Sequence, residues 1–472
     1  MESISRKSFM RYAVSMGIGA GAGMLPIVPS ALATDEADPA HLASNETSGE
    51  IDATNLNALG GSAMSLYDLN KKRKALVEAS EEFTRSDGTV VPAVYNKLRS
   101  LIDTYGVGVG NMDSDESIDL FVSLFSEDEA QAMLQMPYGQ MFTAAEFAGT
   151  SGRDEQECLE ICDNLADRGL LFRAWRSGVP YFHQVPLVAH GVKEYNVARY
   201  YEDGYVDYVG GWGVPSSERR LTAGSPQYRA MPVNLDVVGD ERILALEDWQ
   251  KVIDRAEVIS LAPCICRMHK ARKAGEEVPA LGSEELKSYM STVCGHKMET
   301  CLSFGEEAEY YIERGVGRQI TKEEARQLLS DNVEAGMIVN GSFTRGTETI
   351  CSCHGDCCSV MGSYLAVGVD ALRDTPLYNN ISDYELRWDC DACIGCGACA
   401  NRCPMGAIEM DEDNHPSVTG VCVRCGQCGT VCPAHARTLW AKPEEERLER
   451  GATWLDDENM KAAYRFDTGA IG

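Results

Sequence analysis

Cysteines near the C-terminal end form two runs with the same spacing. The runs are Cys393-x2-Cys396-x2-Cys399-x3-Cys403-Pro404 and Cys422-x2-Cys425-x2-Cys428-x3-Cys432-Pro433, offset by 29 residues at every position. Two-residue gaps let a tight turn place three thiolates around one iron–sulfur cubane, and the fourth cysteine of each run ligates the other cluster. The repeat therefore predicts two [4Fe-4S] clusters. Zinc ribbons use CxxC pairs across a longer loop, and disulfides between residues three apart would be strained.

Residues 388–440 resemble the bacterial dicluster ferredoxins, with both runs and both prolines in place. The resemblance implies a βαββαβ-type fold. Carried over position by position, it implies one cluster on Cys393, Cys396, Cys399 and Cys432 and a second on Cys422, Cys425, Cys428 and Cys403. Glycines at 395, 397, 426 and 429 would let the backbone approach inorganic sulfide and point N–H groups at it.

Cys390 precedes the first run by one further two-residue gap. A frame of 390, 393, 396 and 399 lacks the three-residue gap and the following proline. We therefore interpret Cys390 as a bystander to both clusters. The alternative is a ligand or redox partner that reaches outside the ferredoxin fold, where it could face the upstream cysteines.

Eight further cysteines lie upstream of the two runs. They are Cys264, Cys266, Cys294, Cys301, Cys351, Cys353, Cys357 and Cys358. They could hold two more four-thiolate clusters, or one cluster and a separate metal or thiol site. Zinc held by cysteines, and a redox-active pair at Cys357-Cys358, are the alternatives to iron–sulfur ligation. We interpret His296 and His354 as surface residues or neighbours of the ligands, with ligation as the alternative. Arg267 is either a hydrogen-bond donor to a cluster or an ordinary ion-pair partner.

The segments around these cysteines read PCICR, ETCLSFG, ERGVGRQITKEEA and ICSCHGDCC. Over residues 230–440 they resemble a family of bacterial and archaeal iron–sulfur proteins that pair such a cysteine-rich domain with a C-terminal dicluster ferredoxin. The resemblance implies one or two additional [4Fe-4S] clusters. His354 and Asp356 stand in a motif where further cysteines are expected, so the ligand count of one site stays open.

The segment 117–190 is expected to form three helices and a β-hairpin, with capping boxes at Ser126–Glu129 and Thr143–Glu146. That order resembles a winged helix. Because the segment carries eleven Asp/Glu against four Arg and no Lys, it is unsuited to DNA phosphates, and we interpret it as a packing or docking module. Cys158 and Cys162 lie one turn apart on its third helix. We expect them in the core; ligation or a disulfide is the alternative.

The sequence as a whole predicts a multidomain α+β protein. Helices are also expected at Leu246–Val258, Ser283–Met290 and Thr321–Ala335. The predicted parts are a signal peptide at 1–33, a flexible linker at 34–63, a helical winged-helix-like domain at 64–195, a cysteine-rich mixed α/β iron–sulfur domain at 196–380, a ferredoxin domain at 381–440 and a C-terminal tail at 441–472.

The N-terminus has the layout of an export signal, with a basic start, a Gly/Ala-rich apolar stretch and small residues at Ala31 and Ala33. Residues 5–10 resemble the twin-arginine signal, with Lys7 in place of the second arginine. Prolines and glycines make a membrane anchor the weaker interpretation, and we expect no transmembrane segment after cleavage. The twin-arginine route carries folded proteins, which suits clusters assembled before export.

A net charge of −29 argues against nucleic acid or an anionic membrane as the main partner. No flavin, nicotinamide or hydrolase fingerprint is visible in the sequence. We therefore expect a periplasmic or extracytoplasmic electron-transfer protein with two to four clusters. It would be the conducting subunit of an anaerobic respiratory oxidoreductase and would bind redox partner proteins. The alternatives are a reductase with an open cluster or redox-thiol site within Cys264–Cys358, and a redox sensor built on the winged helix.

Overall fold

The structure is a computed structural model that describes residues 64–110, 112–210, 217–239 and 244–472. All of these residues belong to one compact unit. The expected signal peptide and linker, residues 1–63, lie outside the described residues. Among the helices that are described, none combines the length and the apolar character needed to cross a membrane.

The first part of the unit is helical. Its elements are α2 (Leu66–Ala79), β1 (Phe83–Thr84), β2 (Val90–Val91), α3 (Ala93–Asp103), α4 (Asp115–Leu124), α5 (Glu127–Gln135), α6 (Ala144–Ser151), α7 (Glu155–Asp167), β3 (Leu171–Arg176) and β4 (Val179–Gln184). Both expected capping boxes form, at the starts of α5 and α6. The three expected helices form as α5, α6 and α7 and are followed by the hairpin, but most of α4 also lies within 117–190. The identity of the module as a winged helix stays a prediction.

The hairpin β3–β4 packs within the chain. The Tyr310 hydroxyl, on α14 (Gly305–Glu313), donates to the carbonyl oxygens of Ala166 and Leu171, at 2.7 Å each. Arg173 on β3 forms an ion pair with Glu313 at the end of α14. These contacts agree with a packing role for the module, because its hairpin is held against a helix of the cysteine-rich region.

The cysteine-rich region is built on a six-stranded antiparallel sheet in the order β5-β9-β10-β7-β6-β8. The strands are β5 (Tyr228–Met231), β6 (Ile259–Pro263), β7 (Glu299–Phe304), β8 (Arg318–Gln319), β9 (Ile338–Ser342) and β10 (Thr349–Cys353). Helices before and between the strands are α8 (Val192–Tyr195), α9 (Tyr205–Gly210), α10 (Ser217–Leu221), α11 (Trp249–Arg255), α12 (Ile265–Lys273), α13 (Glu284–Ser288), α14 and α15 (Lys322–Glu334). After β10 come α16 (Ser359–Val367), α17 (Val369–Leu372) and α18 (Pro376–Asn379).

The helices expected in this region form as α11, α13 and α15, each shorter than predicted. The largest difference is at α11. Asp248 accepts hydrogen bonds from the N–H groups of Gln250 and Lys251, so the helix begins at Trp249, and Ala245–Glu247 forms a separate 3-10 turn. A side-chain cap therefore decides where this helix begins.

Alternation along the central strands separates the apolar core from the cysteines. Leu261, Leu302 and Ile350 belong to one apolar cluster with residues of α11 and α15. Their sequence neighbours Cys301 and Cys351 point away from it, because successive side chains of a strand face opposite sides of a sheet. The sheet thus presents thiols on the face opposite its main core.

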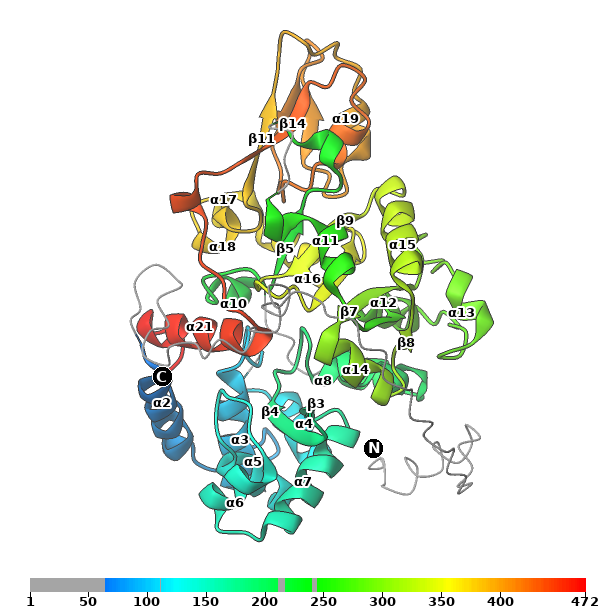
Figure 1. Cartoon of the computed structure of the whole chain (residues 1–472). Coiled ribbons are helices and arrows are strands. Elements are labelled where there is room, and N and C mark those ends of the chain that lie inside the picture. Colours follow the sequence, from blue (N-terminus) through cyan, green and yellow to red (C-terminus); the bar gives the residue numbers. More distant parts are fainter. Residues whose placement is uncertain (1–63, 111, 211–216, 240–243) are drawn as a thin grey trace, which may run out of the picture. The chain divides into compact units, whose positions relative to one another are not determined.

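Residues 384–441 contain β11 (Tyr384–Trp388), α19 (Ala398–Arg402), β12 (Ile408–Met410), β13 (Pro416–Val418), α20 (Gln427–Thr430) and β14 (Arg437–Ala441). The elements follow in the order β-α-β-β-α-β, and β12 pairs with β13. β11 pairs with β14 (Figure 1). Both short helices begin at a glycine in the left-handed region, Gly397 with φ 73° and Gly426 with φ 89°. The 29-residue sequence repeat is therefore also a repeat of backbone conformation.

The range 441–472 is not a tail, contrary to the prediction. It contains a 3-10 turn, Glu444–Glu446, and the helix α21 (Trp454–Asp467), most of whose residues are buried. The helix lies beside α2 (Figure 1), and Arg73 Nη1 on α2 donates to Asn459 Oδ1 at 2.9 Å. The sequence of α21 is rich in charge, but Lys461 pairs with Asp457 within the helix and Arg465 pairs with Asp103 of α3.

Glu458 on α21 provides a test of this burial. Burial raises the pKa of Glu458 well above its ordinary 4.5, and the neighbouring Asp457 raises it further. Because Glu458 has a higher pKa in the folded chain than in the unfolded chain, its protonation stabilises the fold. This contribution is complete below pH 4.5 and is lost as the pH rises through the pKa that Glu458 has in the folded chain. We expect Glu458→Gln to raise the melting temperature relative to the unsubstituted chain more at pH 8.0 than at pH 5.5. Differential scanning calorimetry at both pH values measures these melting temperatures. If the variant and the unsubstituted chain differed by the same amount at both pH values, the burial of Glu458 would be contradicted.

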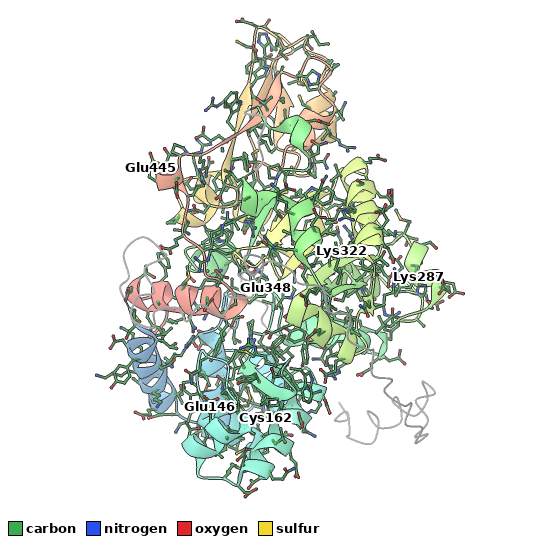
Figure 2. The ribbon with its side chains drawn as sticks, in the orientation of Figure 1. Glu146, Cys162, Lys287, Lys322, Glu348 and Glu445 are labelled. Atoms are coloured by element: carbon green, nitrogen blue, oxygen red, sulfur yellow. The ribbon has the colours of Figure 1, made fainter. Side chains whose placement is uncertain are left out.

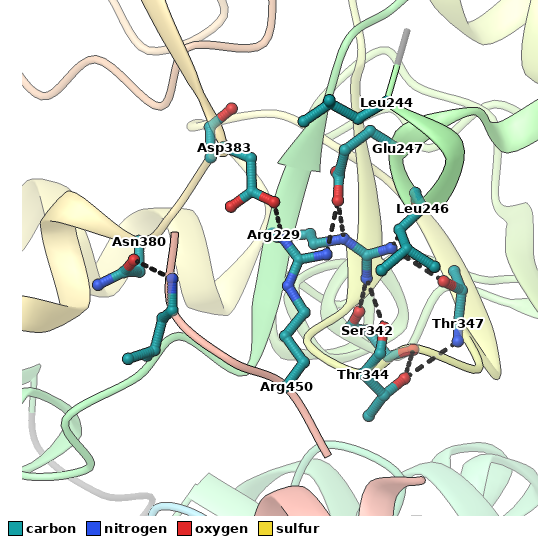
Figure 3. Close-up of polar contacts among 12 residues, drawn as sticks. Arg229, Leu244, Leu246, Glu247, Ser342, Thr344, Thr347, Asn380, Asp383 and Arg450 are labelled. Atoms are coloured by element: carbon teal, nitrogen blue, oxygen red, sulfur yellow. Dashed lines mark hydrogen bonds and ion pairs between the residues drawn. The ribbon is translucent and has the colours of Figure 1, made fainter. Parts of the chain in front are cut away.

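A buried ion-pair network ties the sheet to the segments before β11 and after the 3-10 turn Glu444–Glu446 (Figure 3). Glu247 Oε1 accepts hydrogen bonds from Arg229 Nε at 2.8 Å and from Arg450 Nη1 at 2.5 Å. The second amino group of Arg450 contacts Asp383 at 2.6 Å. The network therefore connects β5, the entry to β11 and the chain that leads to α21.

Candidate metal centres

Four of the C-terminal cysteines surround one pocket. They come from both runs and are Cys393, Cys396, Cys399 and Cys432. The wall is completed by Trp388, Ile394, Met410 and the buried Arg437, among others. These four are the residues predicted for the first cluster, and the fold brings them together across the repeat. Their role as ligands stays a prediction.

The remaining four cysteines of the runs form the second group. Cys422, Cys425 and Cys428 are electrostatic neighbours of Cys403, the fourth cysteine of the first run. Burial raises the pKa of the Cys428 thiol to about 12. A free thiolate at this position is therefore unfavourable, and ligation would require a bound metal to offset the burial of the charge.

The fourth cysteine of each run accepts the same backbone hydrogen bond. The N–H of Ala407 donates to Cys403 Sγ at 3.3 Å, and the N–H of Ala436 donates to Cys432 Sγ at 3.2 Å. Each donor lies four residues after its cysteine, beyond the Cys-Pro pair. Such bonds stabilise a thiolate and orient it, as hydrogen bonds around ligated sulfur do. Both halves of the repeat therefore present their fourth sulfur in the same way.

Residues 392–436 match the 4Fe-4S dicluster domain family. The match supports two [4Fe-4S] clusters in this domain, as the cysteine repeat predicts. The ferredoxin Fdx8 of Sorangium cellulosum is 34% identical to the chain over 74 residues, which are 16% of this chain and 66% of that ferredoxin. The chain thus spans slightly less than two thirds of this relative's length. No solved structure matches the chain.

Cys390 stands apart from the groups in the dicluster domain. Its side chain is exposed, does not line the pocket of Cys393, and lies 3.9 Å from Asp391 Oδ1. The position fits a bystander. Cys390 does not lie at the junction between the dicluster domain and the upstream cysteines, which other residues form.

The upstream cysteines lie at the ends of neighbouring strands and at helix starts. Cys301 is on β7, Cys351 and Cys353 are on β10, and Cys264 and Cys358 are the N-cap residues of α12 and α16. Neither N-cap cysteine makes a side-chain capping bond. Because helix N-termini carry partial positive charge, two helix ends point stabilising dipoles at these thiols.

Seven of the eight upstream cysteines line a single pocket: Cys264, Cys266, Cys301, Cys351, Cys353, Cys357 and Cys358. Their thiols form a contact series, in which Cys301 meets Cys351 across adjacent strands and Cys353 meets Cys358. Cys358 in turn contacts Cys266. Residues separated by almost 100 positions in sequence are thus assembled into one sulfur-rich chamber.

Cations are buried in the wall of this chamber. Arg267 is 1% exposed; its hydrogen-bond partners among the described residues are Cys357 Sγ, Met337 Sδ, Thr300 Oγ1 and the carbonyl oxygens of Lys297 and Ser352, with no carboxylate among them. Burial alone would lower the pKa of Arg267, but the thiols of Cys264 and Cys357 outweigh it and raise the pKa. A buried guanidinium without a carboxylate requires nearby anionic sulfur. Metal-bound thiolates supply that charge, so the chamber fits an anionic cluster.

Sequence reasoning missed the part of the wall that comes from residues 188–228. Lys193 and Arg220 are each 5% exposed and line the chamber together with Glu194, His190 and Tyr228. Burial raises the pKa of Glu194, and Lys193 opposes this shift. These residues belong to no motif with a recognisable spacing, so nothing in the sequence could have linked them to the cysteines.

Cys294 is the upstream cysteine outside the chamber wall. It lies on the loop between α13 and β7 and contacts the thiol of Cys357. A hydrogen bond from Cys357 is the largest influence on Cys294 and lowers its pKa to about 5. His296 belongs to the same group of possible ligands.

The upstream chamber and the dicluster domain are in direct contact. The N–H of Gly355, in the loop before Cys357, donates to the carbonyl oxygen of Pro404 at 3.0 Å. Cys353 and Cys358 share an apolar cluster with Cys425, and Cys403 and Cys422 pack against it. The junction thus lies between the upstream thiols and the group of Cys422, and not at Cys390.

Cys158 and Cys162 are fully buried in the core of the helical part, on α7 (Figure 2 labels Cys162). Burial raises the pKa of both thiols. Cys158 Sγ lies 3.7 Å from the hydroxyl of Ser151. This environment is that of small apolar core residues and fits the core interpretation better than ligation.

Proposed function

We propose that this protein conducts single electrons through a series of iron–sulfur clusters, as an exported subunit of an anaerobic respiratory oxidoreductase. The dicluster domain supplies two clusters. The upstream cysteines supply one or two more, which extend the path away from the dicluster domain. The chain would accept electrons from one redox partner protein and deliver them to another.

One observation carries this proposal: the contact between the upstream chamber and the dicluster domain. The groups of Cys393 and Cys422 share an apolar cluster through Cys399 and Cys428. The group of Cys422 shares a second apolar cluster with the upstream thiols. Three sulfur-rich sites therefore follow one another in direct packing contact, which is the arrangement that stepwise electron transfer needs.

Metal analysis of the anaerobically purified chain tests the upstream part of the path. We expect more than the about eight iron and eight sulfide per chain that the dicluster domain accounts for. Cys353→Ser should then lower both by about four, because it removes a thiolate from the chamber wall. Cys158→Ala, a buried cysteine in the helical core, is the matched control and should change neither. Iron that stays at about eight would refute an upstream cluster.

Export and partner choice rest on the N-terminal sequence and on the charge of −29, which would steer the protein toward a basic partner. Cell fractionation tests the first point. We expect the full chain outside the cytoplasm and an Arg6→Lys variant retained inside, because it leaves no arginine in the signal pair. Equal distribution of the two would count against the twin-arginine route.

A further inference from the structure

Two overlapping groups of possible metal ligands lie at the rim of the upstream chamber. The ligand atoms of Cys294, His296 and Cys357 all lie within 4.8 Å of one another, and the same holds for His296, His354 and Asp356. The two imidazole rings are 4.8 Å apart. The two groups, one with two sulfur donors and one with a carboxylate, therefore adjoin each other at His296, which belongs to both.

The close spacing favours a single ion over a cluster. Zinc bonds of about 2.0 Å to nitrogen and about 2.3 Å to sulfur imply tetrahedral ligand atoms roughly 3.3 to 3.8 Å apart. A cubane places each of its thiolates on a different iron atom and so holds them further apart. The ligand atoms of Cys294, His296 and Cys357 lie within 4.8 Å of one another, an upper bound that includes this tetrahedral range.

The surroundings of the group are those of a bound metal. Arg267 Nε donates to Cys357 Sγ at 3.5 Å, so a buried cation lies beside this sulfur. Asp356 contacts His296 Nε2 at 3.0 Å and His354 Nδ1 at 2.9 Å, so one carboxylate orients both rings. Ligating histidines commonly have such a carboxylate partner.

Exposure distinguishes this rim from the deeper thiols. Cys357 is buried, Cys294 and both histidines are half-buried, and Asp356 is exposed. The side of the group formed by Asp356 and His354 therefore faces solvent. An ion bound here could exchange a water molecule or another small ligand on that side.

The deeper thiols remain sufficient for one cluster without the rim. Once Cys294 and Cys357 are set aside, six upstream cysteines line the chamber: Cys264, Cys266, Cys301, Cys351, Cys353 and Cys358. Four thiolates hold one cubane. The eight upstream cysteines thus divide into a deep set for a cluster and a rim pair that has imidazole neighbours.

We propose that Cys294, Cys357 and His296 bind one divalent ion of the zinc type, with the fourth coordination position open to solvent. Three protein ligands with one exchangeable position are typical of catalytic zinc sites, whereas structural sites are closed by four. The zinc site deepens the proposed function by limiting the upstream clusters to one. It rests on the proposed function only for the presence of that cluster among the deeper thiols.

Zinc, iron and sulfide contents of the purified chain and its variants test the proposal. We expect about one zinc and about twelve iron per chain. Cys294→Ser and His296→Gln should each remove the zinc and leave iron and sulfide unchanged. Cys353→Ser is the matched control and should remove about four iron and leave the zinc. Loss of about four iron from Cys294→Ser, or an unsubstituted chain with about sixteen iron and no zinc, would overturn the proposal.

X-ray absorption at the zinc edge tests the ligand set on the unsubstituted protein, so the result does not depend on whether a variant folds. The unsubstituted protein should show two sulfur ligands and two nitrogen or oxygen ligands around zinc. Four sulfur ligands would overturn the assignment. A chain with about eight iron and one such zinc would refute the upstream cluster of the proposed function while supporting the rim site, so the two failures are distinguishable.

Discussion

Cys399→Ser is expected to remove one of the two clusters of the dicluster domain, about four iron and four sulfide per chain, and to leave the other intact. Cys399 is buried and lines the pocket with Cys393, Cys396 and Cys432. Serine is a poor ligand for iron, and the pocket offers no further thiol, since Cys390 is exposed and outside it. Iron and sulfide analysis, together with EPR of the reduced protein, measures the loss.

The crossed ligation of the two runs makes this test sharper. Cys432→Ser should abolish the same EPR signal as Cys399→Ser, although Cys432 belongs to the second run. Cys403→Ser should abolish the other signal, because Cys403 neighbours Cys422, Cys425 and Cys428. Cys390→Ser, three residues before a pocket cysteine, is the matched control and should change neither signal. If Cys390→Ser lost iron, the assignment of the first cluster would be wrong.

The second large effect is expected from Glu247→Gln. Glu247 is fully buried and is the carboxylate that Arg229 and Arg450 share (Figure 3). Arg229 is also fully buried and donates further hydrogen bonds to Leu246 O and Thr347 Oγ1. Without the Glu247 charge, two guanidinium groups would remain in the interior with Asp383 as their single close carboxylate partner among the described residues. Breaking a buried pair in this way costs about 3 to 5 kcal/mol.

Chemical denaturation followed by circular dichroism would measure the free energy of unfolding of this variant. Glu306→Gln is the matched control, because Glu306 forms an arginine pair with Arg176 in which both side chains are more than 40% exposed. Surface pairs contribute about 0 to 1 kcal/mol, so this variant should unfold almost like the unsubstituted chain. Similar losses in the two variants would mean that the Glu247 network does not hold the sheet and the C-terminal segments together.

Sequence predictions succeeded where the determining interactions are local. The two cysteine runs identify the dicluster domain because their spacing is set by the reach of a tight turn around a cubane. The capping boxes at Ser126 and Thr143 formed as expected because cap and partner are three residues apart. The same reasoning failed at residues 441–472, where charged residues lie buried in α21 because their partners lie within the helix and on distant α3.

The sequence by itself determined the cofactor class and the number of clusters in residues 392–436, because all the information lies in spacings of two and three residues. Only the tertiary structure decided how the upstream cysteines are grouped. Antiparallel pairing of β10 with β7 brings Cys351 to Cys301, and the loops bring Cys294 and His296 to Cys357. The same folding buries Arg267 and Lys193 beside sulfur. These contacts span tens to hundreds of residues, and no local spacing encodes them.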